Sequence, residues 1–229
     1  MKRLIGRVAI VTGGSSGIGA ACAAALAAEG AAVLATGRRF VSGQARVPAP
    51  GEVVEAHLDV TDEVEVKTRF AEMPQVDLLV CSAGTATFGP VLNAQAADLR
   101  VMLNVHVLGT MLCAREALRR MQPRRKGHIV AIGSHVAHRA FTDCGGYTAA
   151  KAGQLGLMKV IGEEARPYEV RVTTLLAGAT DTAIWDDRPG FDRGKMMTPQ
   201  DVASFLVAIV VRPGISVDEV MVMPPAGAL

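Results

Sequence analysis

Short apolar runs alternate with longer alanine-rich segments along the whole chain, and this alternation limits the possible folds more than any other feature. The apolar runs predict strands at residues 8–12, 32–36, 53–58, 77–81, 128–132, 170–176 and 218–223. The segments between them predict helices over residues 17–29, 61–73, 97–121, 147–166 and 199–210. Strands that are apolar throughout are typical of a parallel sheet buried on both faces. The sequence therefore predicts an α/β, doubly wound fold of about seven parallel strands with helices on both faces.

The composition bounds the size and the partners of the protein. The chain has 229 residues without a compositional break, so we expect a single domain over residues 1–229. The formal net charge is +2, far from the strong basic bias of nucleic-acid binders, so no nucleic-acid partner is expected.

The cysteines and the hydropathy pattern point to a location. Cys22, Cys81, Cys113 and Cys144 are scattered through mostly apolar sequence, which is typical of reduced, buried thiols. No apolar run approaches the about 20 residues of a membrane span. We therefore expect a cytoplasmic protein that does not enter a membrane.

A glycine-rich segment, Thr12-Gly13-Gly14-Ser15-Ser16-Gly17-Ile18-Gly19, lies between the first strand and the first helix. Glycines permit a tight turn here and allow backbone amides to approach a pyrophosphate at the positive end of a helix. The strand–loop–helix context at the amino terminus predicts a dinucleotide site in a Rossmann fold.

Ser134, Tyr147 and Lys151 form a second chemical constellation. Tyr147 and Lys151 are four residues apart, one helical turn, and Ser134 lies 13 residues before Tyr147 at the end of a buried strand. A phenol ionises near about pH 10, and a close cation favours the phenolate. The spacing predicts a general acid/base device at the carboxyl end of the sheet.

With these motifs together, the chain resembles the short-chain dehydrogenase/reductase family over nearly its full length. The glycine segment matches the family's Thr-Gly-x-x-x-Gly-x-Gly, and four residues match its catalytic tetrad in order: Asn104, Ser134, Tyr147 and Lys151. The resemblance implies NAD(P)(H)-dependent interconversion of a carbonyl and an alcohol. Ser134 is expected to bind the carbonyl oxygen, Tyr147 to donate the proton, Lys151 to favour the phenolate and bind the nicotinamide ribose, and Asn104 to hold a proton-feeding water.

The resemblance also implies a set of cofactor contacts, including an acidic pair near adenine and a threonine near the carboxamide. The expected cofactor-binding residues are Gly13, Ser15, Ser16, Gly17, Ile18, Gly19, Gly37, Arg38, Arg39, Asp59, Val60, Ala83, Gly84, Tyr147, Lys151, Gly178, Thr180 and Thr182. No metal is expected.

The end of the second strand predicts the cofactor preference. An acidic residue there would bind the ribose 2′-hydroxyl of NAD, but this chain has Gly37 followed by Arg38 and Arg39. Because arginine can bind a phosphate through two donors, we predict NADP(H), with Arg38 as the main contact and NAD(H) as the less favoured alternative.

Several positions depart from the family pattern. Cys81-Ser82-Ala83-Gly84 replaces Asn-Asn-Ala-Gly, which puts the side-chain bracing between strands in doubt, and Ala177-Gly178 replaces Pro-Gly. Residues 38–52 are too short and proline-rich for the helix of most relatives, and residues 183–197 leave room only for a reduced substrate lid.

Other interpretations stay open. His135, His138, Asp143 and Cys144 could supply metal ligands, although a loop beside the substrate pocket is the favoured interpretation. The chain could also be a catalytically silent NAD(P)-binding sensor, which would not need a tetrad. A serine hydrolase lacks its Gly-x-Ser-x-Gly elbow, and an extended-family sugar epimerase would need a longer chain.

The partners expected are a small carbonyl or alcohol substrate and a second copy of the chain. The family commonly forms dimers or tetramers through two helices, here 97–121 and 147–166. Leu155 and Met158 suit either that interface or the core. Phe141, Cys144, Trp185 and Phe191 suit the walls of a substrate pocket or, equally, the core.

Overall fold

Seven parallel strands form one sheet in the order β3-β2-β1-β4-β5-β6-β7. The computed structural model describes residues 2–186, 188 and 190–227. The order reverses between β1 and β4, and in such sheets ligands bind at the carboxyl ends of the strands beside that point. The strands are β1 Val8–Thr12, β2 Ala32–Thr36, β3 Val53–Ala56, β4 Leu78–Cys81, β5 Gly127–Ser134, β6 Val170–Ala177 and β7 Glu219–Val222.

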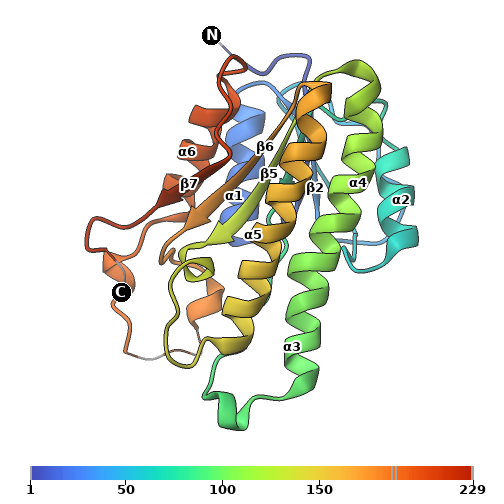
Figure 1. Ribbon diagram of the computed structural model, residues 1–229. Helices are drawn as coiled ribbons and strands as arrows, with labels where there is room; N and C mark the ends of the chain where they lie inside the picture. The colour runs from blue at the N-terminus through green and yellow to red at the C-terminus, as the bar shows by residue number, and fades with distance from the viewer. Residues whose placement is uncertain (1, 187, 189, 228–229) are drawn as a thin grey trace.

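Helices cover both faces of the sheet, which confirms the predicted doubly wound architecture (Figure 1). The helices α1 Gly17–Ala28 and α6 Pro199–Val210 pack on one face. The helices α2 Glu63–Ala71, α4 Gly109–Met121 and α5 Gly145–Ala165 pack on the other. Successive residues of β1 alternate between two separate cores, since Ile10 lies in one and Val11 in the other.

The long helix predicted over residues 97–121 is interrupted. The helix α3 Ala96–Leu103 continues into a π-helical segment, Asn104–Leu108, and then into α4. By length and composition alone, residues 96–124 could cross a membrane. In the fold, the α4 residues Leu112, Ala114 and Ala117 are buried in the core against the sheet.

The element ends differ from prediction where they concern the site. The strand β5 extends to Ser134, two residues beyond the apolar run, and α5 begins at Gly145 rather than at Tyr147. Asp62 caps α2 through hydrogen bonds from the amides of Val64 and Glu65.

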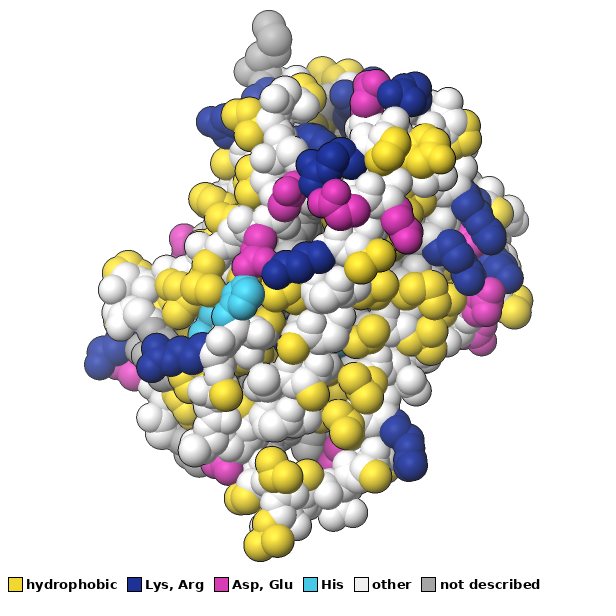
Figure 2. Space-filling view, viewed as in Figure 1, with side chains coloured by type: hydrophobic (Ala, Val, Ile, Leu, Met, Phe, Trp, Pro, Cys, Tyr) yellow, Lys and Arg dark blue, Asp and Glu magenta, His cyan; other side chains and the backbone are white. Residues whose placement is uncertain are grey.

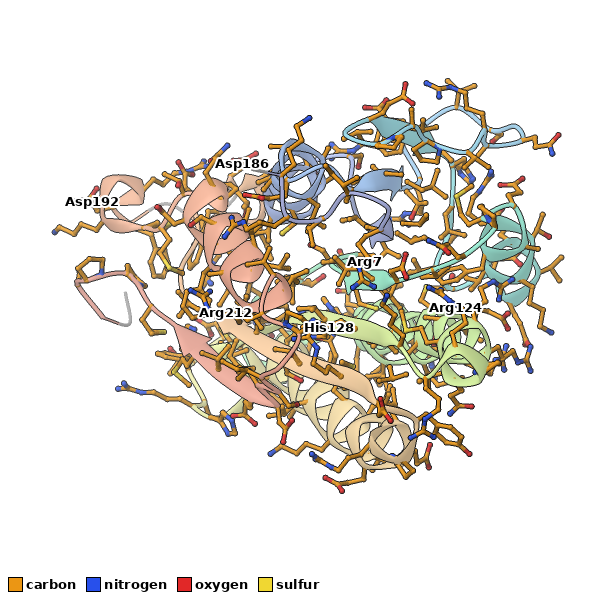
Figure 3. All side chains as sticks on the ribbon, turned by 90° about the horizontal axis from the view of Figure 1, so that it is seen from above. Arg7, Arg124, His128, Asp186, Asp192 and Arg212 are labelled. Carbon is orange, nitrogen blue, oxygen red and sulfur yellow. The ribbon has the colours of Figure 1, made fainter. Side chains whose placement is uncertain are left out.

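Charged and polar side chains gather at the amino ends of the strands, opposite the predicted site. Arg7, Arg124 and His128 lie around this end when the sheet is viewed from above (Figure 3). Asp77 is buried at the centre of this group of side chains. Its carboxylate accepts hydrogen bonds from the Val8 amide at 2.8 Å and from Arg124 at 2.5 Å. The arginines of residues 115–125, just before β5, all pair with carboxylates, and they are Arg115, Arg119, Arg120, Arg124 and Arg125.

Candidate active site

A cleft of about 1120 Å³ lies at the carboxyl ends of the strands. The segments that follow each of the strands β1 to β6 contribute to its walls. Every residue that the sequence predicts to bind a cofactor lines this cleft, from Gly13 in the first loop to Thr182 after β6. The structure thus brings together residues that lie up to 169 positions apart in the chain.

The glycine loop is shaped by close backbone contacts. Gly13 and Gly17 have φ angles of +68° and +52°, a region that favours glycine. A Cβ on Gly13 would lie 2.6 Å from the amide nitrogen of Ala83, and one on Gly19 would lie 2.2 Å from the carbonyl oxygen of Gly13. The loop therefore packs tightly against both its neighbouring strand and its own helix.

The amino end of α1 fits a pyrophosphate. Ser16, the N-cap residue, makes no side-chain capping bond, so first-turn amides remain available to an anion at the positive end of the helix. Thr182, predicted to lie near the carboxamide and the pyrophosphate, lies beside this turn: a Cβ on Gly17 would be 3.1 Å from its Cγ2 atom.

Two arginines lie at the end of β2. Arg39 donates a hydrogen bond to the Ser15 hydroxyl at 3.2 Å, which ties it to the glycine loop. Burial acts to raise the pKa of Asp59, but hydrogen bonds from the amide and hydroxyl of Thr61 outweigh it and hold the pKa below its usual value. Arg38 is exposed and adds a smaller electrostatic contribution to this lowering.

The bracing that Cys81-Ser82 left in doubt comes from β1. The Thr12 hydroxyl accepts hydrogen bonds from the amides of Ser82 and Ala83 at 3.2 and 3.3 Å. It also lies 3.4 Å from the Val80 carbonyl oxygen, to which it donates. The backbone after β4 is therefore held beside the glycine loop without asparagine side chains.

Ser134 and Tyr147 meet at the end of β5. Ser134 is the last residue of the strand and is buried, and its hydroxyl accepts a hydrogen bond from the Val136 amide at 3.4 Å. Tyr147 lies in the first turn of α5. Burial raises the pKa of Tyr147 to about 12, and a hydrogen bond with Ser134 offsets only part of the rise. The phenol is therefore protonated at neutral pH.

Contrary to the prediction from the sequence, Lys151 does not bring the pKa of Tyr147 down toward neutrality. Its ammonium group lies 5.9 Å from the centroid of the Tyr147 ring, and it donates to the Ile132 carbonyl at 2.8 Å and to the Gln154 side chain at 3.0 Å. Gln154 in turn donates to the Thr110 hydroxyl at 2.9 Å. Burial lowers the pKa of Lys151 itself to about 7, because desolvation disfavours the ammonium.

Asn104 is not brought to the site. It is exposed and does not line the cleft, whereas His106, two residues further along the π-helical segment, is buried and does. Residues two apart on a helix project to roughly opposite sides, so both cannot face the cleft. The residue beside Tyr147 on this helix is therefore His106.

The sequence led to no predicted role for His106. A polar residue between two valines, Val105 and Val107, was nevertheless a signal that its side chain could be buried. Its Nε2 atom donates to the Thr85 carbonyl at 2.7 Å, and its ring meets the Tyr147 ring edge-on with centroids 5.7 Å apart. Burial and the Lys151 charge lower the pKa of His106 to about 3, so the imidazole is neutral. Among the described residues, its buried Nδ1 atom has no hydrogen-bond partner.

Aromatic side chains enclose the catalytic end of the cleft. Phe141, Cys144, Trp185 and Phe191 all line it, which supports the pocket interpretation of these residues. The Trp185 and Phe191 rings pack with centroids 4.8 Å apart, and His135 packs against Phe141. In the described part of the chain, no group of three or more His, Cys, Asp or Glu side chains is arranged to hold a metal.

Comparisons with known proteins agree with this geometry. Residues 7–190 match the short chain dehydrogenase family. The chain is 33% identical to (+)-borneol dehydrogenase 1 of Salvia officinalis, covering 88% of this chain and 85% of that protein. It is 32% identical to glycine betaine reductase ATRR of Emericella nidulans, but the match spans only 19% of that longer protein.

A solved structure extends the likeness to three dimensions. The alcohol dehydrogenase of the archaeon Thermococcus sibiricus, complexed with 5-hydroxy-NADP, superposes with a TM-score of 0.85 at 25% identity, over 97% of this chain and 98% of that one. The chain belongs to the short-chain dehydrogenase/reductase family, a family of oxidoreductases that use NAD(P)(H).

Proposed function

We propose that this protein is an NADP(H)-dependent oxidoreductase that interconverts a carbonyl and an alcohol, with Tyr147 as general acid/base. The observation that carries the proposal is that Tyr147 and Ser134 lie together in the same cleft as the glycine loop. A cofactor held by that loop and a substrate held by Ser134 and Tyr147 would meet at the carboxyl end of β5.

The residues divide the work of a carbonyl reduction. When bound, the nicotinamide supplies the hydride. Negative charge then builds on the substrate oxygen, which Ser134 stabilises through a hydrogen bond and Tyr147 protonates. A phenol with a pKa of about 12 holds its proton until the substrate oxygen becomes more basic.

Lys151 and its partners prepare the site for the next cycle. With a pKa of about 7, Lys151 exchanges a proton near neutrality. Its hydrogen bonds to Ile132 and Gln154 hold the ammonium near Tyr147, 5.9 Å from the centroid of the phenol ring. We assign Lys151 the return of a proton to Tyr147. Its second role is contact with the nicotinamide ribose, which the family resemblance implies.

The preference for NADP(H) rests on the end of β2. No carboxylate occupies position 37, and the exposed Arg38 stands next to an arginine already fixed to the glycine loop. Arg38 is free to turn its two-donor fork toward a 2′-phosphate.

Affinities for NADPH and NADH test this preference. We expect Arg38→Ala to weaken NADPH binding about 10-fold or more and to leave NADH binding nearly unchanged, because only NADPH carries the phosphate. Arg139→Ala, in an exposed position outside the cleft, is the matched control. Equal wild-type affinities for the two cofactors would contradict the assignment.

We also propose that the protein forms a homo-oligomer and that it is located in the cytoplasm. Exposed apolar side chains gather over α3 and α5 (Figure 2), among them Leu99, Val101 and Val160. Met158 belongs to the core instead, and Leu155 is buried within the protomer. The four cysteines are buried free thiols, which suits a reducing compartment.

A further inference from the structure

The cleft contains one charged side chain that the proposed chemistry does not use. Arg188 lines the cleft in the segment that follows β6 and is half-buried. Its guanidinium carbon lies 4.0 Å from the centroid of the Phe88 ring, 4.9 Å from that of Phe191 and 5.4 Å from that of Trp185. Aromatic rings therefore surround the cation and displace part of its water.

The N–H donors of this guanidinium are not used within the described residues. No described side chain or carbonyl accepts a hydrogen bond from the Arg188 side chain, and no described carboxylate pairs with it. Arg193, on the same segment, differs because it pairs with Asp181 and Asp186. A guanidinium that stacks on rings and keeps its donors open suits a planar anion, because its fork matches the two oxygens of a carboxylate.

The carboxylates that face the cleft leave this donor available. Asp59 lies at the end predicted to hold adenine and accepts hydrogen bonds from Thr61. Asp143 is exposed at the catalytic end, and no ion pair joins it to Arg188 among the described contacts.

Arg188 is close enough to the reacting group for one small molecule to touch both. The guanidinium of Arg188 stacks on the Phe88 ring. The same ring packs edge-on against the Tyr147 ring, with centroids 5.7 Å apart at an interplanar angle of 63°. One aromatic ring therefore separates the cation from the phenol. A substrate whose carbonyl lies at Tyr147 would reach Arg188 through a short apolar spacer packed on Phe88.

We propose that Arg188 binds a carboxylate of the substrate, so that the enzyme acts on oxo acids and hydroxy acids with an apolar body. This assignment rests on the proposed carbonyl/alcohol function and names its substrate class. The rings of Phe88, Trp185 and Phe191 pack the apolar body and strengthen the ion pair by excluding water.

Tryptophan fluorescence tests the binding step without turnover. The chain has a single tryptophan, and Trp185 lies beside Arg188, so its emission reports ligands at this position. The probes are 4-oxo-4-phenylbutanoate and its methyl ester, titrated into protein with and without saturating NADP⁺. We expect the acid to bind at least about 10-fold more tightly than the ester, because a charge-assisted bidentate pair is lost in the ester.

Variants then assign the effect to the guanidinium. Arg188→Met should weaken binding of the acid about 10- to 100-fold and leave the ester unchanged. Arg188→Lys should restore only part of the loss, because it keeps the charge without the fork. Arg139→Met removes an exposed cation that stacks on Phe141 but does not itself line the cleft, and it should change neither.

The outcomes separate this assignment from the proposed function. Equal binding of acid and ester by the wild type, or a weaker affinity for NADP⁺ as the main effect of Arg188→Met, would overturn the carboxylate site. NADPH oxidation with the ester and no preference for the acid would also overturn it while supporting the proposed function. Selective binding of the acid without NADPH oxidation by any carbonyl compound would support the site and contradict the proposed function.

Discussion

Lys151 and Tyr147 have opposite pKa shifts with one physical cause. Burial disfavours the charged form of each, so the pKa of the phenol rises to about 12 and that of the ammonium falls to about 7. The two groups together thus hold a tightly bound proton on Tyr147 and an exchangeable one on Lys151. The ammonium of Lys151 donates hydrogen bonds to Ile132 and Gln154, and hydrogen bonds of this kind favour the charged form.

Replacing Gln154 by leucine should move the pKa of Lys151 further down. The variant removes an acceptor that favours the ammonium, so the neutral amine dominates at a lower pH. We expect the limb of the kcat/KM profile that reports Lys151 to shift to lower pH, while the KM for the cofactor changes less than kcat. Gln154→Glu should move the limb the other way, because a carboxylate favours the ammonium. An unchanged profile in both variants would show that Gln154 does not tune Lys151.

The π-helical segment, Asn104–Leu108, decides which residue of the long helix reaches the site. Such insertions are rare and occur often at functional sites. Here the segment aims His106 at the Thr85 carbonyl and the Tyr147 ring. Asn104 was predicted from its match to the family's tetrad in residue type and order, and such a match cannot show how a π-helical segment turns the residues that follow.

The glycine loop is the element on which cofactor binding depends. Gly19→Ala would put a Cβ against the carbonyl oxygen of Gly13 at 2.2 Å, so the backbone of the loop must move. We expect NADPH affinity to fall by about 10-fold or more, as measured by fluorescence titration. Gly156→Ala is the matched control, since a Cβ there, within α5, meets nothing within 4 Å. Its expected effect is a stabilisation of about 1 kcal/mol with unchanged affinity.

Two buried histidines couple the stability of the whole molecule to pH. Burial lowers the pKa of both His106 and His128 to about 3 from an ordinary value of 6.5. The unfolded chain therefore binds up to two more protons than the folded one between pH 3 and pH 6.5. The free energy of unfolding should rise with pH through this window, by up to about 1.4 kcal/mol per pH unit for each histidine, and flatten above it.

Urea unfolding at several pH values measures this slope. His128→Gln should reduce the slope of the unfolding free energy by up to about 1.4 kcal/mol per pH unit, the share of one proton, because glutamine does not titrate. The substitution can also lower stability at every pH, since His128 hydrogen-bonds the Thr173 hydroxyl at 2.8 Å, but that loss does not alter the slope. A slope that matches the wild type would contradict the assignment of a neutral, buried imidazole.

At this scale the sequence is a good guide to the fold and a partial guide to the site. Apolar strands and the glycine spacing are local patterns, so the parallel sheet and the dinucleotide loop follow from them. Other features of the site depend on contacts between distant segments and do not follow from local patterns. They are the hydrogen bond of Thr12 to Ser82, the link from Lys151 through Gln154 to Thr110, and the stacking of Arg188 on Phe88. Burial of Tyr147 depends on the assembled cleft, so the direction of its pKa shift could not be predicted from the residue four positions away.

The most direct test of the account is NADPH oxidation over a panel of carbonyl compounds, by wild type and by Tyr147→Phe. We expect turnover by the wild type and a loss of about 100- to 10,000-fold in the variant, because phenylalanine cannot donate the proton. NADPH binding and the unfolding midpoint of the variant should remain close to those of the wild type. If the wild-type protein binds NADPH but does not oxidise it with any carbonyl compound of the panel, the result would contradict the account and favour a nucleotide-binding sensor.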